Sequence, residues 1–270
     1  MGTSSAPTKN APTKPVLVDS HCHLNYLDDP AARLDDARAR GVRGFLCIGV
    51  DHSGLANVQA LASEHDDVWA SAGVHPDAAS EGEAAQDWLP AALEHPQVVA
   101  VGEMGLDYAR EPDTATKTMQ RDCFEFQLEL AASAQLPVVI HTRGAQADTL
   151  ALLREFPSVT GVLHCFTESW DMAASALEMG YYVSMSGIVT FKNAEQVREV
   201  ARAVPADRLL VETDAPWLAP VPNRGKTNQP AFVADTAQFV ADLRGVGLNE
   251  LAQQTTANFN ALFGRSIAAD

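Results

Sequence analysis

Five short apolar segments, far apart along the chain, each carry histidine, glutamate or aspartate at or just after the apolar run. The segments are VLVDSHCHL (16–24), VVAVGEMGLD (98–107), PVVIHTR (137–143), VLHCF (162–166) and LLVETDAP (209–216). Apolar runs of four to six residues are typical of buried strands. Burying an unpaired polar side chain is costly, so its recurrence at these places needs a reason. The pattern indicates strands whose ends carry the ligands of a divalent metal.

Strand signals and helix signals alternate along the 270 residues. The strand candidates are 15–21, 43–50, 68–74, 98–103, 137–142, 160–165, 181–186 and 208–213. The helix candidates are about 29–40, 54–65, 84–95, 117–135, 145–155, 170–179, 193–203, 230–243 and 249–262. Near-continuous apolar strands separated by helices indicate a parallel sheet covered on its outer face. Eight such strands at this length predict one α/β domain, a closed (β/α)8 TIM barrel over residues 15–270, after a flexible leader at 1–14.

Closure of the barrel would gather the candidate ligands at one end. Active sites of such barrels lie at the carboxyl ends of the strands. His21 and His23 are two residues apart on the first strand, so their side chains face the same side. The last strand neighbours the first only in a closed sheet, which would bring Asp214 beside this pair. The remaining candidates end the fourth, fifth and sixth strands: Glu103, His141 and His164.

Imidazole and carboxylate ligands suit zinc and other first-row divalent ions such as nickel, and oxygen ligands leave manganese and magnesium open. Six ligands are too many for one tetrahedral ion with an open position. They suit two divalent cations that share a bridging carboxylate, for which Glu103 is central in strand order. The first ion would have the ligands His21, His23, Glu103 and Asp214. The second would have Glu103, His141 and His164.

Two ions about 3.5–4 Å apart can activate a shared water for hydrolysis. Asp214 is placed to accept the proton of that water, and His75, in GVHP, can bind substrate or protonate the leaving group. Arg143 follows His141 by two residues and can reach a substrate phosphate, or it can pair with a surface carboxylate. Lys192 and Arg224 follow strands at the same end of the barrel, where they either contact substrate or face solvent.

The net charge of −16 limits how the chain can meet nucleic acid. Such a charge repels polyanions at long range, and no basic stripe is visible in the sequence. A nucleic-acid substrate would therefore contact the protein through a terminus held in a small pocket. No run is long enough to span a membrane, and the first fourteen residues lack the apolar stretch of a secretory signal. We expect a cytoplasmic monomer or weak oligomer, without membrane association or an obligate protein partner.

The motifs VLVDSHCHL, GVHP, VGEMGLDY, PVVIHTRGA, HCF, SGIVTFKNA, VETDAPWLAP and TTANFNALF resemble, in the same order, those of the TatD-type metal-dependent deoxyribonucleases. The resemblance covers about residues 15–264. It implies an amidohydrolase-like TIM barrel, two divalent cations and hydrolysis of phosphodiester bonds in DNA, often from the 3′ end. The ligand positions of the family match the six candidates above. Its further active-site histidine matches His75.

Other functions stay open at this point. Ala109 and Asn223 depart from the family pattern beside the expected pocket, so they affect substrate preference more than catalysis. Trp217 and Tyr108 can stack on a ligand or simply wall the pocket. One alternative is an amide, lactone or phosphotriester hydrolase on the same scaffold. Others are a D-aminoacyl-tRNA deacylase and a barrel retained as a binding protein.

Overall fold

The structure, a computed structural model, describes residues 15–268, and within them eight strands alternate with helices. The strands are β1 (Leu17–Cys22), β2 (Val42–Cys47), β3 (Val68–Ala72), β4 (Val98–Asp107), β5 (Val138–Arg143), β6 (Gly161–Leu163), β7 (Tyr182–Met185) and β8 (Leu209–Val211). The helices are α1 (Pro30–Ala39), α2 (His52–Glu64), α3 (Gly82–Ala92), α4 (Thr114–Ala134), α5 (Gln146–Glu155), α6 (Trp170–Glu178), α7 (Glu195–Ala203), α8 (Val233–Arg244) and α9 (Leu248–Phe263). Short 3-10 turns join them, namely η1 (Leu24–Tyr26), η2 (Pro76–Glu81), η3 (Gly187–Thr190), η4 (Ala206–Arg208) and η5 (Pro230–Phe232).

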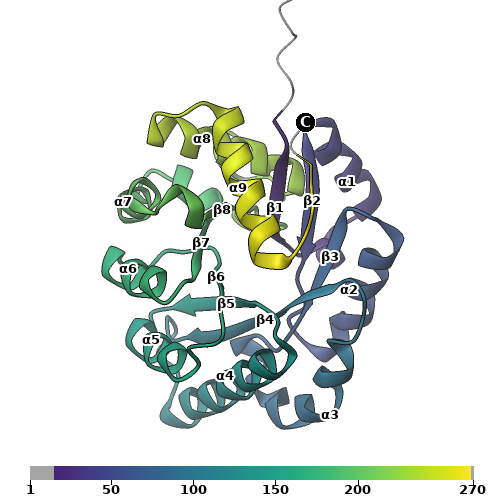
Figure 1. Cartoon of the computed structure of the whole chain (residues 1–270), viewed down its shortest axis with the longest axis vertical. Coiled ribbons are helices and arrows are strands. Elements are labelled where there is room, and N and C mark those ends of the chain that lie inside the picture. Colours follow the sequence, from purple (N-terminus) through teal and green to yellow (C-terminus); the bar gives the residue numbers. More distant parts are fainter. Residues whose placement is uncertain (1–14, 269–270) are drawn as a thin grey trace, which may run out of the picture.

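All neighbouring strands pair in parallel in the order β1 to β8, and main-chain contacts join the last strand to the first. The amide of Asp214 donates to the carbonyl of His21 at 2.9 Å, and the amide of His23 donates to the carbonyl of Ala215 at 2.8 Å. Cys22 and Ala215 form a parallel bridge. Figure 1 shows the resulting ring of strands with the helices around it. The predicted TIM barrel is confirmed.

A buried carboxylate of β1 also joins β1 to the segment that follows β8. Asp19 of β1 is fully buried, and it accepts hydrogen bonds from the amide and the hydroxyl of Thr213 at 2.8 and 2.6 Å. Burial raises the pKa of Asp19 well above its usual value, although the hydrogen bonds from Thr213 oppose this. The two donors satisfy a group that would otherwise destabilise the core.

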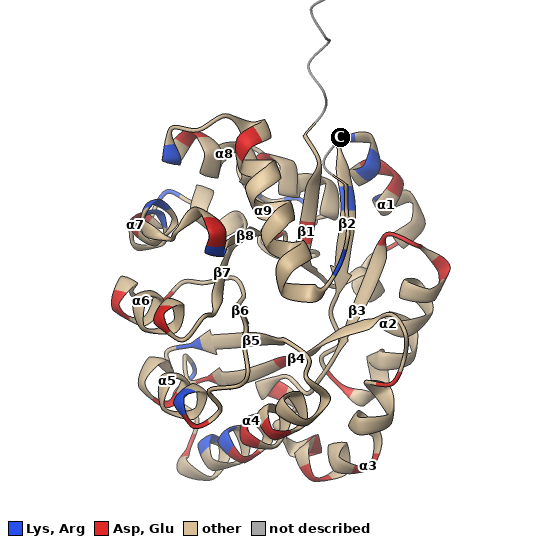
Figure 2. Cartoon of the chain, in the orientation of Figure 1, with Lys and Arg blue, Asp and Glu red and all other residues tan. Residues whose placement is uncertain are grey.

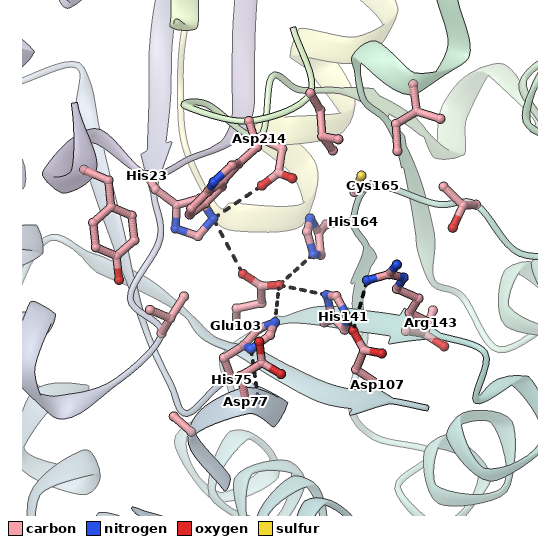
Figure 3. A pocket seen from close by; sticks show the side chains of 18 of the residues that line it. His23, His75, Asp77, Glu103, Asp107, His141, Arg143, His164, Cys165 and Asp214 are labelled. Atoms are coloured by element: carbon pink, nitrogen blue, oxygen red, sulfur yellow. Dashed lines mark hydrogen bonds and ion pairs between the residues drawn. The ribbon is translucent and has the colours of Figure 1, made fainter. Parts of the chain in front are cut away.

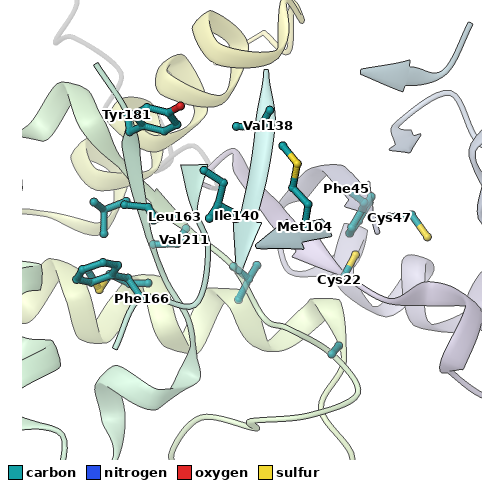
Figure 4. Close-up of a cluster of buried hydrophobic side chains, with 14 of the residues drawn as sticks. Cys22, Phe45, Cys47, Met104, Val138, Ile140, Leu163, Phe166, Tyr181 and Val211 are labelled. Carbon is teal, nitrogen blue, oxygen red and sulfur yellow. The ribbon is translucent and has the colours of Figure 1, made fainter. Parts of the chain in front are cut away.

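The strands are buried on both faces, as their near-continuous apolar sequences require. All six residues of β1 and all four of β7 are buried. Figure 4 shows part of the main core, in which Ile140, Leu163 and Val211 come from successive or nearby strands. The core therefore sits within the ring and between the ring and its helices.

Helix α9 closes one end of the barrel. Its residues Phe259, Leu262 and Phe263 belong to one buried cluster with residues from seven strands. The strand residues are at or near the first position in β4, β5, β6, β7 and β8, for example Val139 in β5 and Tyr182 in β7. A helix that meets these residues together must lie across the amino-terminal end. The opposite, carboxyl-terminal end is the one left open for chemistry.

Strand β4 is longer than predicted. The sequence pattern placed its end at Glu103, but pairing with β5 continues through Asp107, which lies opposite Arg143. A register shift falls between Val101 and Met104. Glu103 is therefore inside the strand rather than at its tip, and four further residues extend along the mouth of the barrel.

Charge is spread over the outside of the molecule. In Figure 2 the blue Lys and Arg segments are separated by red Asp and Glu segments and form no continuous stripe in this view. Among the helices of residues 15–268, none is both long and apolar enough to span a membrane. The predicted leader at 1–14 lies outside the described residues.

Candidate metal centre

The Glu103 carboxylate lies at the centre of the open end, surrounded by histidines from other strands (Figure 3). It is 3% exposed and lines a cavity of about 760 Å3. The structure brings all six predicted metal ligands and His75 together around this carboxylate and the neighbouring Asp214. The convergence follows from barrel closure, because β1, β4, β5, β6 and the segment after β8 all end at this rim.

One oxygen of Glu103 faces the first strand. Its Oε2 atom lies 3.4 Å from Nε2 of His21 and 3.8 Å from Nε2 of His23. Oδ1 of Asp214 faces the same two nitrogens at 3.6 and 3.4 Å. These four residues are those predicted for the first ion.

The other oxygen of Glu103 faces the histidines of β3 to β6. Its Oε1 atom lies 2.8 Å from Nε2 of His164, 3.2 Å from Nδ1 of His141 and 3.4 Å from Nε2 of His75. His141 with Glu103 and His75 forms a group compact enough to hold an ion, whereas His164 groups with His21 and Asp214. His164 is also stacked on His21, with ring centroids 3.7 Å apart. His141 and His164 of the predicted second set thus both face Oε1 of Glu103, but the compact group around this oxygen contains His75 in place of His164.

Several buried ring nitrogens in the cluster have no hydrogen-bond partner within the described part of the chain. They are Nδ1 of His21, Nδ1 of His23 and both nitrogens of His164, which lie within ion-pair distance of Glu103 and Glu212 but form no hydrogen bond with them. The Nε2 atoms of His21 and His23 approach each other to 3.2 Å, with a carboxylate on either side. Unpaired buried polar atoms are rare, and nitrogen lone pairs that converge with carboxylates are the donor set of a divalent cation. The residues present therefore fit a metal.

The electrostatic balance keeps the two carboxylates ionised. Burial acts to raise the pKa of Glu103, but the surrounding histidines, with His164 first among them, outweigh it, and the pKa lies well below its usual value. Burial likewise opposes ionisation of Asp214, while the hydrogen bond with His23 and the nearby imidazoles lower its pKa overall. Ionised carboxylates are the form that binds a cation.

The pKa values of His21 and His164 are shifted in opposite directions. Burial, reinforced by His164, lowers the pKa of His21. Burial also acts to lower the pKa of His164, but Glu103 and Glu212 outweigh it and raise this pKa well above its usual value. The site thus favours a positive charge beside Glu103, whether a proton or a metal ion supplies it.

His75 is held in one tautomer by its own turn. Its Nδ1 atom accepts a hydrogen bond from the amide of Asp77 at 3.1 Å, at the start of η2. A neutral ring that accepts at Nδ1 carries its proton at Nε2, which points at Oε1 of Glu103. Burial is the main cause that lowers the pKa of His75. His75 is therefore built to donate a hydrogen bond into the cavity.

Two carboxylates behind the cluster were not found from the sequence. Oδ2 of Asp107 lies 3.1 Å from Nε2 of His141, and Oε1 of Glu212 lies 3.4 Å from Nδ1 of His164. Burial opposes ionisation of Asp107, but the hydrogen bond from His141 and further contacts lower its pKa to about 2. Carboxylates in this position orient histidine ligands and fix their tautomer. Glu212 could have been found, since it is a carboxylate within the predicted buried strand 208–213, where an unpaired charge is costly.

The cations predicted to contact substrate divide into two groups. Arg143 lines the cavity with a side chain that is 57% exposed, and its Nη1 atom lies 3.7 Å from Oδ2 of Asp107. Arg110, which the sequence pattern did not single out, lines the cavity as well. Lys192 and Arg224 are absent from the wall that the described residues form, and the Arg224 guanidinium packs 3.8 Å from the centroid of Phe191. Contact of these two with substrate stays a prediction.

Comparison with known proteins identifies the family. A model of the TatD related DNases matches residues 18–264. The chain belongs to the TatD family. This membership confirms the prediction of a metal-dependent hydrolase that acts on ester bonds.

Individual relatives cover nearly the whole chain. The chain is 49% identical to the uncharacterized metal-dependent hydrolase YcfH of Escherichia coli strain K12 over 256 residues, which are 92% of this chain and 95% of that protein. It is 38% identical to the 3′-5′ ssDNA/RNA exonuclease TatD of Klebsiella pneumoniae strain 342, over 89% of this chain and 92% of that one. Its fold matches the crystal structure of the TatD homologue YjjV from Escherichia coli K12 with a TM-score of 0.87 and 30% identity, over 93% of this chain and 98% of that chain.

Proposed function

We propose that this TatD family member is a nuclease that hydrolyses phosphodiester bonds at the ends of DNA, as a 3′–5′ exonuclease with two divalent cations. The carrying observation is the position of Glu103, whose two oxygens face different sets of histidines. A carboxylate so placed suits a bridge between two ions. The name of the Klebsiella pneumoniae relative, a single-strand DNA and RNA exonuclease, supports a nucleic-acid substrate.

The protein residues have separate roles in this proposal. His21, His23, Glu103 and Asp214 would hold one cation, and Glu103, His141 and His164 the other. When bound, such a pair of ions lowers the pKa of water and neutralises charge on the phosphate. Asp214, whose Oδ1 atom faces the histidines, would accept the proton of the attacking water.

Substrate contacts come from the opposite wall of the cavity. Nε2 of His75 donates its hydrogen bond to the leaving oxygen or to a non-bridging phosphate oxygen. The Arg143 guanidinium, more than half exposed and only weakly paired with Asp107, is free to bind a phosphate in two-point fashion. These residues bind and orient the phosphodiester between the histidines and the mouth of the cavity.

The test uses protein reconstituted in turn with zinc, manganese, magnesium and nickel. Single- and double-stranded DNA oligonucleotides labelled at the 3′ or the 5′ end serve as substrates, with RNA of the same sequence alongside. We expect metal-dependent release of mononucleotides from the 3′ end, and loss of this release in Asp214→Ala. Assays of D-aminoacyl-tRNA and of ester, lactone and amide panels accompany it. Turnover of one of these without cleavage of any oligonucleotide would overturn the proposal.

A further inference from the structure

Two large aromatic side chains stand in solvent at the mouth of the cavity. Trp217, which follows β8, is 48% exposed, and Tyr26, which ends η1, is 46% exposed. Both line the cavity, and their ring centroids are 5.7 Å apart at an interplanar angle of 61°. The ring of His23 lies between them and the metal cluster, 5.1 Å from Trp217 and 5.8 Å from Tyr26. The two rings thus form an angled apolar wall beside the reacting centre.

The Trp217 backbone is held by a fully buried side chain. Asn228 is 0% exposed, and its amide group donates both to the carbonyl of Thr213 at 2.8 Å and to the carbonyl of Trp217. The amide of Trp217 in turn donates to the carbonyl of Asp214 at 2.9 Å. Asn228 therefore fixes the turn that carries both a candidate ligand and an exposed tryptophan. The backbone from which the exposed ring projects is therefore fixed, as a side chain that binds a ligand requires.

Lys and Arg side chains cannot supply most of the affinity for a polyanion here. Of the described residues that line the cavity, Arg110 and Arg143 are the only Lys or Arg, whereas five carry carboxylates, namely Asp51, Asp77, Glu103, Asp107 and Asp214. The whole chain has a net charge of −16. Beyond the reacting phosphate, whose charge the proposed cations would neutralise, a nucleic-acid end must then be held mainly by contacts other than salt bridges. Aromatic rings supply such contacts, since each base stacked on one adds about 1–3 kcal/mol.

We propose that Trp217, together with Tyr26, is a stacking platform for the unpaired terminal nucleobase of the substrate, while its phosphodiester lies at the metal cluster. The inference rests on the proposed function and names the side chains that would select an end whose last base is not stacked in a duplex, in keeping with the single-strand name of the Klebsiella pneumoniae relative. A base inside a helix cannot reach Trp217 without unpairing. Every base has an aromatic face, so the platform selects strandedness rather than sequence.

Binding without turnover provides the first test. The probes are 2′-deoxynucleoside 5′-monophosphates and 2-deoxyribose 5-phosphate, which lacks a base, and their affinities are measured by isothermal titration calorimetry. Trp170→Ala is the matched control, because Trp170 is 38% exposed and is not part of the cavity wall described above. We expect the nucleotides to bind the wild type and Trp170→Ala with equal affinity. Trp217→Ala should bind them roughly fivefold to hundredfold more weakly, and Trp217→Phe should regain much of the loss.

Equal affinity of the wild type for the nucleotides and for 2-deoxyribose 5-phosphate would overturn the platform, as would unchanged nucleotide affinity in Trp217→Ala.

Kinetics provide the second test, with blunt duplexes compared with duplexes that carry a single-stranded 3′ overhang. We expect a lower KM for the overhang in the wild type, and loss of most of this preference in Trp217→Ala. The same preference in both proteins would contradict the inference while leaving the nuclease intact. If the protein bound nucleotides through Trp217 but cleaved no oligonucleotide, only the proposed nuclease activity would be contradicted.

Discussion

Oδ2 of Asp107 lies 3.1 Å from Nε2 of His141 and accepts its hydrogen bond from the far side of the ring. The near side of the ring presents Nδ1 to Glu103 at 3.2 Å. With the proton held at Nε2, Nδ1 keeps its lone pair and is available to a cation. Asp107 is thus a positioning residue for His141, and Oε1 of Glu212 lies near Nδ1 of His164 at the longer distance of 3.4 Å.

Removal of Asp107 should therefore weaken metal binding without removing a ligand. We expect Asp107→Ala to lower metal affinity by roughly tenfold to hundredfold, because the ring of His141 is no longer oriented. Asp107→Asn should lose less, since its amide oxygen still accepts the hydrogen bond. Affinity is measured by competition with a chelator of known strength. Asp87→Ala, an exposed carboxyl of α3, is the control, and equal affinities in all four proteins would show that Asp107 does not position the ligand.

The central place of Glu103 leads to a distinct expectation about stoichiometry. Because each of its oxygens faces a separate set of histidines, Glu103→Ala should reduce the occupancy of both ions. His164→Ala should empty mainly one. Elemental analysis of the purified variants measures metal per chain. If Glu103→Ala retained the metal content of the wild type, the bridging role would be wrong.

The sequence carried enough information for the barrel and for its ligands, for a physical reason. In a closed parallel ring, every buried strand ends at the same rim, so a polar residue placed after an apolar run is also placed in space. His21, His23, His141 and His164 follow this rule directly. Asp214 needed one step more, because its position beside β1 depends on closure.

Asp107 was missed because the fourth strand was predicted to end at Glu103. Gly105 has a φ of 138°, and a side chain there would clash with the carbonyl oxygen of His141. Glycine at this position lets β4 stay paired with β5 past Glu103, which carries Asp107 to the rim. The pattern of apolar residues in a sequence does not distinguish a glycine at which two strands approach closely from a glycine at which a strand ends. The positions of Lys192 and Arg224 were not predictable either, since long loops decide which cations face the cavity.

Arg143 should contribute to substrate binding rather than to the chemical step. We expect Arg143→Ala to raise KM for a phosphodiester several-fold with little change in kcat, because a phosphate contact present before and during reaction is lost. The slope of log KM against log salt should become shallower by about 0.7 for a single-stranded substrate. Lys192→Ala and Arg224→Ala test the other two predicted contacts, and their side chains lie outside the cavity wall that residues 15–268 form. An unchanged KM in Arg143→Ala would exclude the phosphate contact.

The buried thiol of Cys47 should make stability fall at high pH. Burial raises its pKa to about 12, and an unfolded chain has a cysteine pKa of about 8.5. Above the unfolded pKa the unfolded state loses the proton while the folded state keeps it. The stabilisation is therefore full below about pH 8.5 and is lost as pH rises towards 12. The free energy of unfolding of each protein is measured by urea titration at about pH 8 and at about pH 10.5. Its decrease between these pH values should be roughly 2 kcal/mol smaller for Cys47→Ala than for the wild type. Parallel losses in the two proteins would contradict the raised pKa.

A substitution in α9 should lower the stability of the fold without changing the metal centre. Phe259 of α9 is fully buried against the amino-terminal ends of the strands, with ring centroids 5.7 Å from Trp69 and 4.7 Å from Phe263. Phe259→Ala leaves a cavity there and should cost about 3–5 kcal/mol of unfolding free energy in urea. The metal cluster lies at the other end of the barrel, so metal content and KM at low temperature should not change. Ala261→Gly, at an exposed position of the same helix, should cost only about 1 kcal/mol. A loss of metal in Phe259→Ala while the protein remains folded would show that the two ends are coupled.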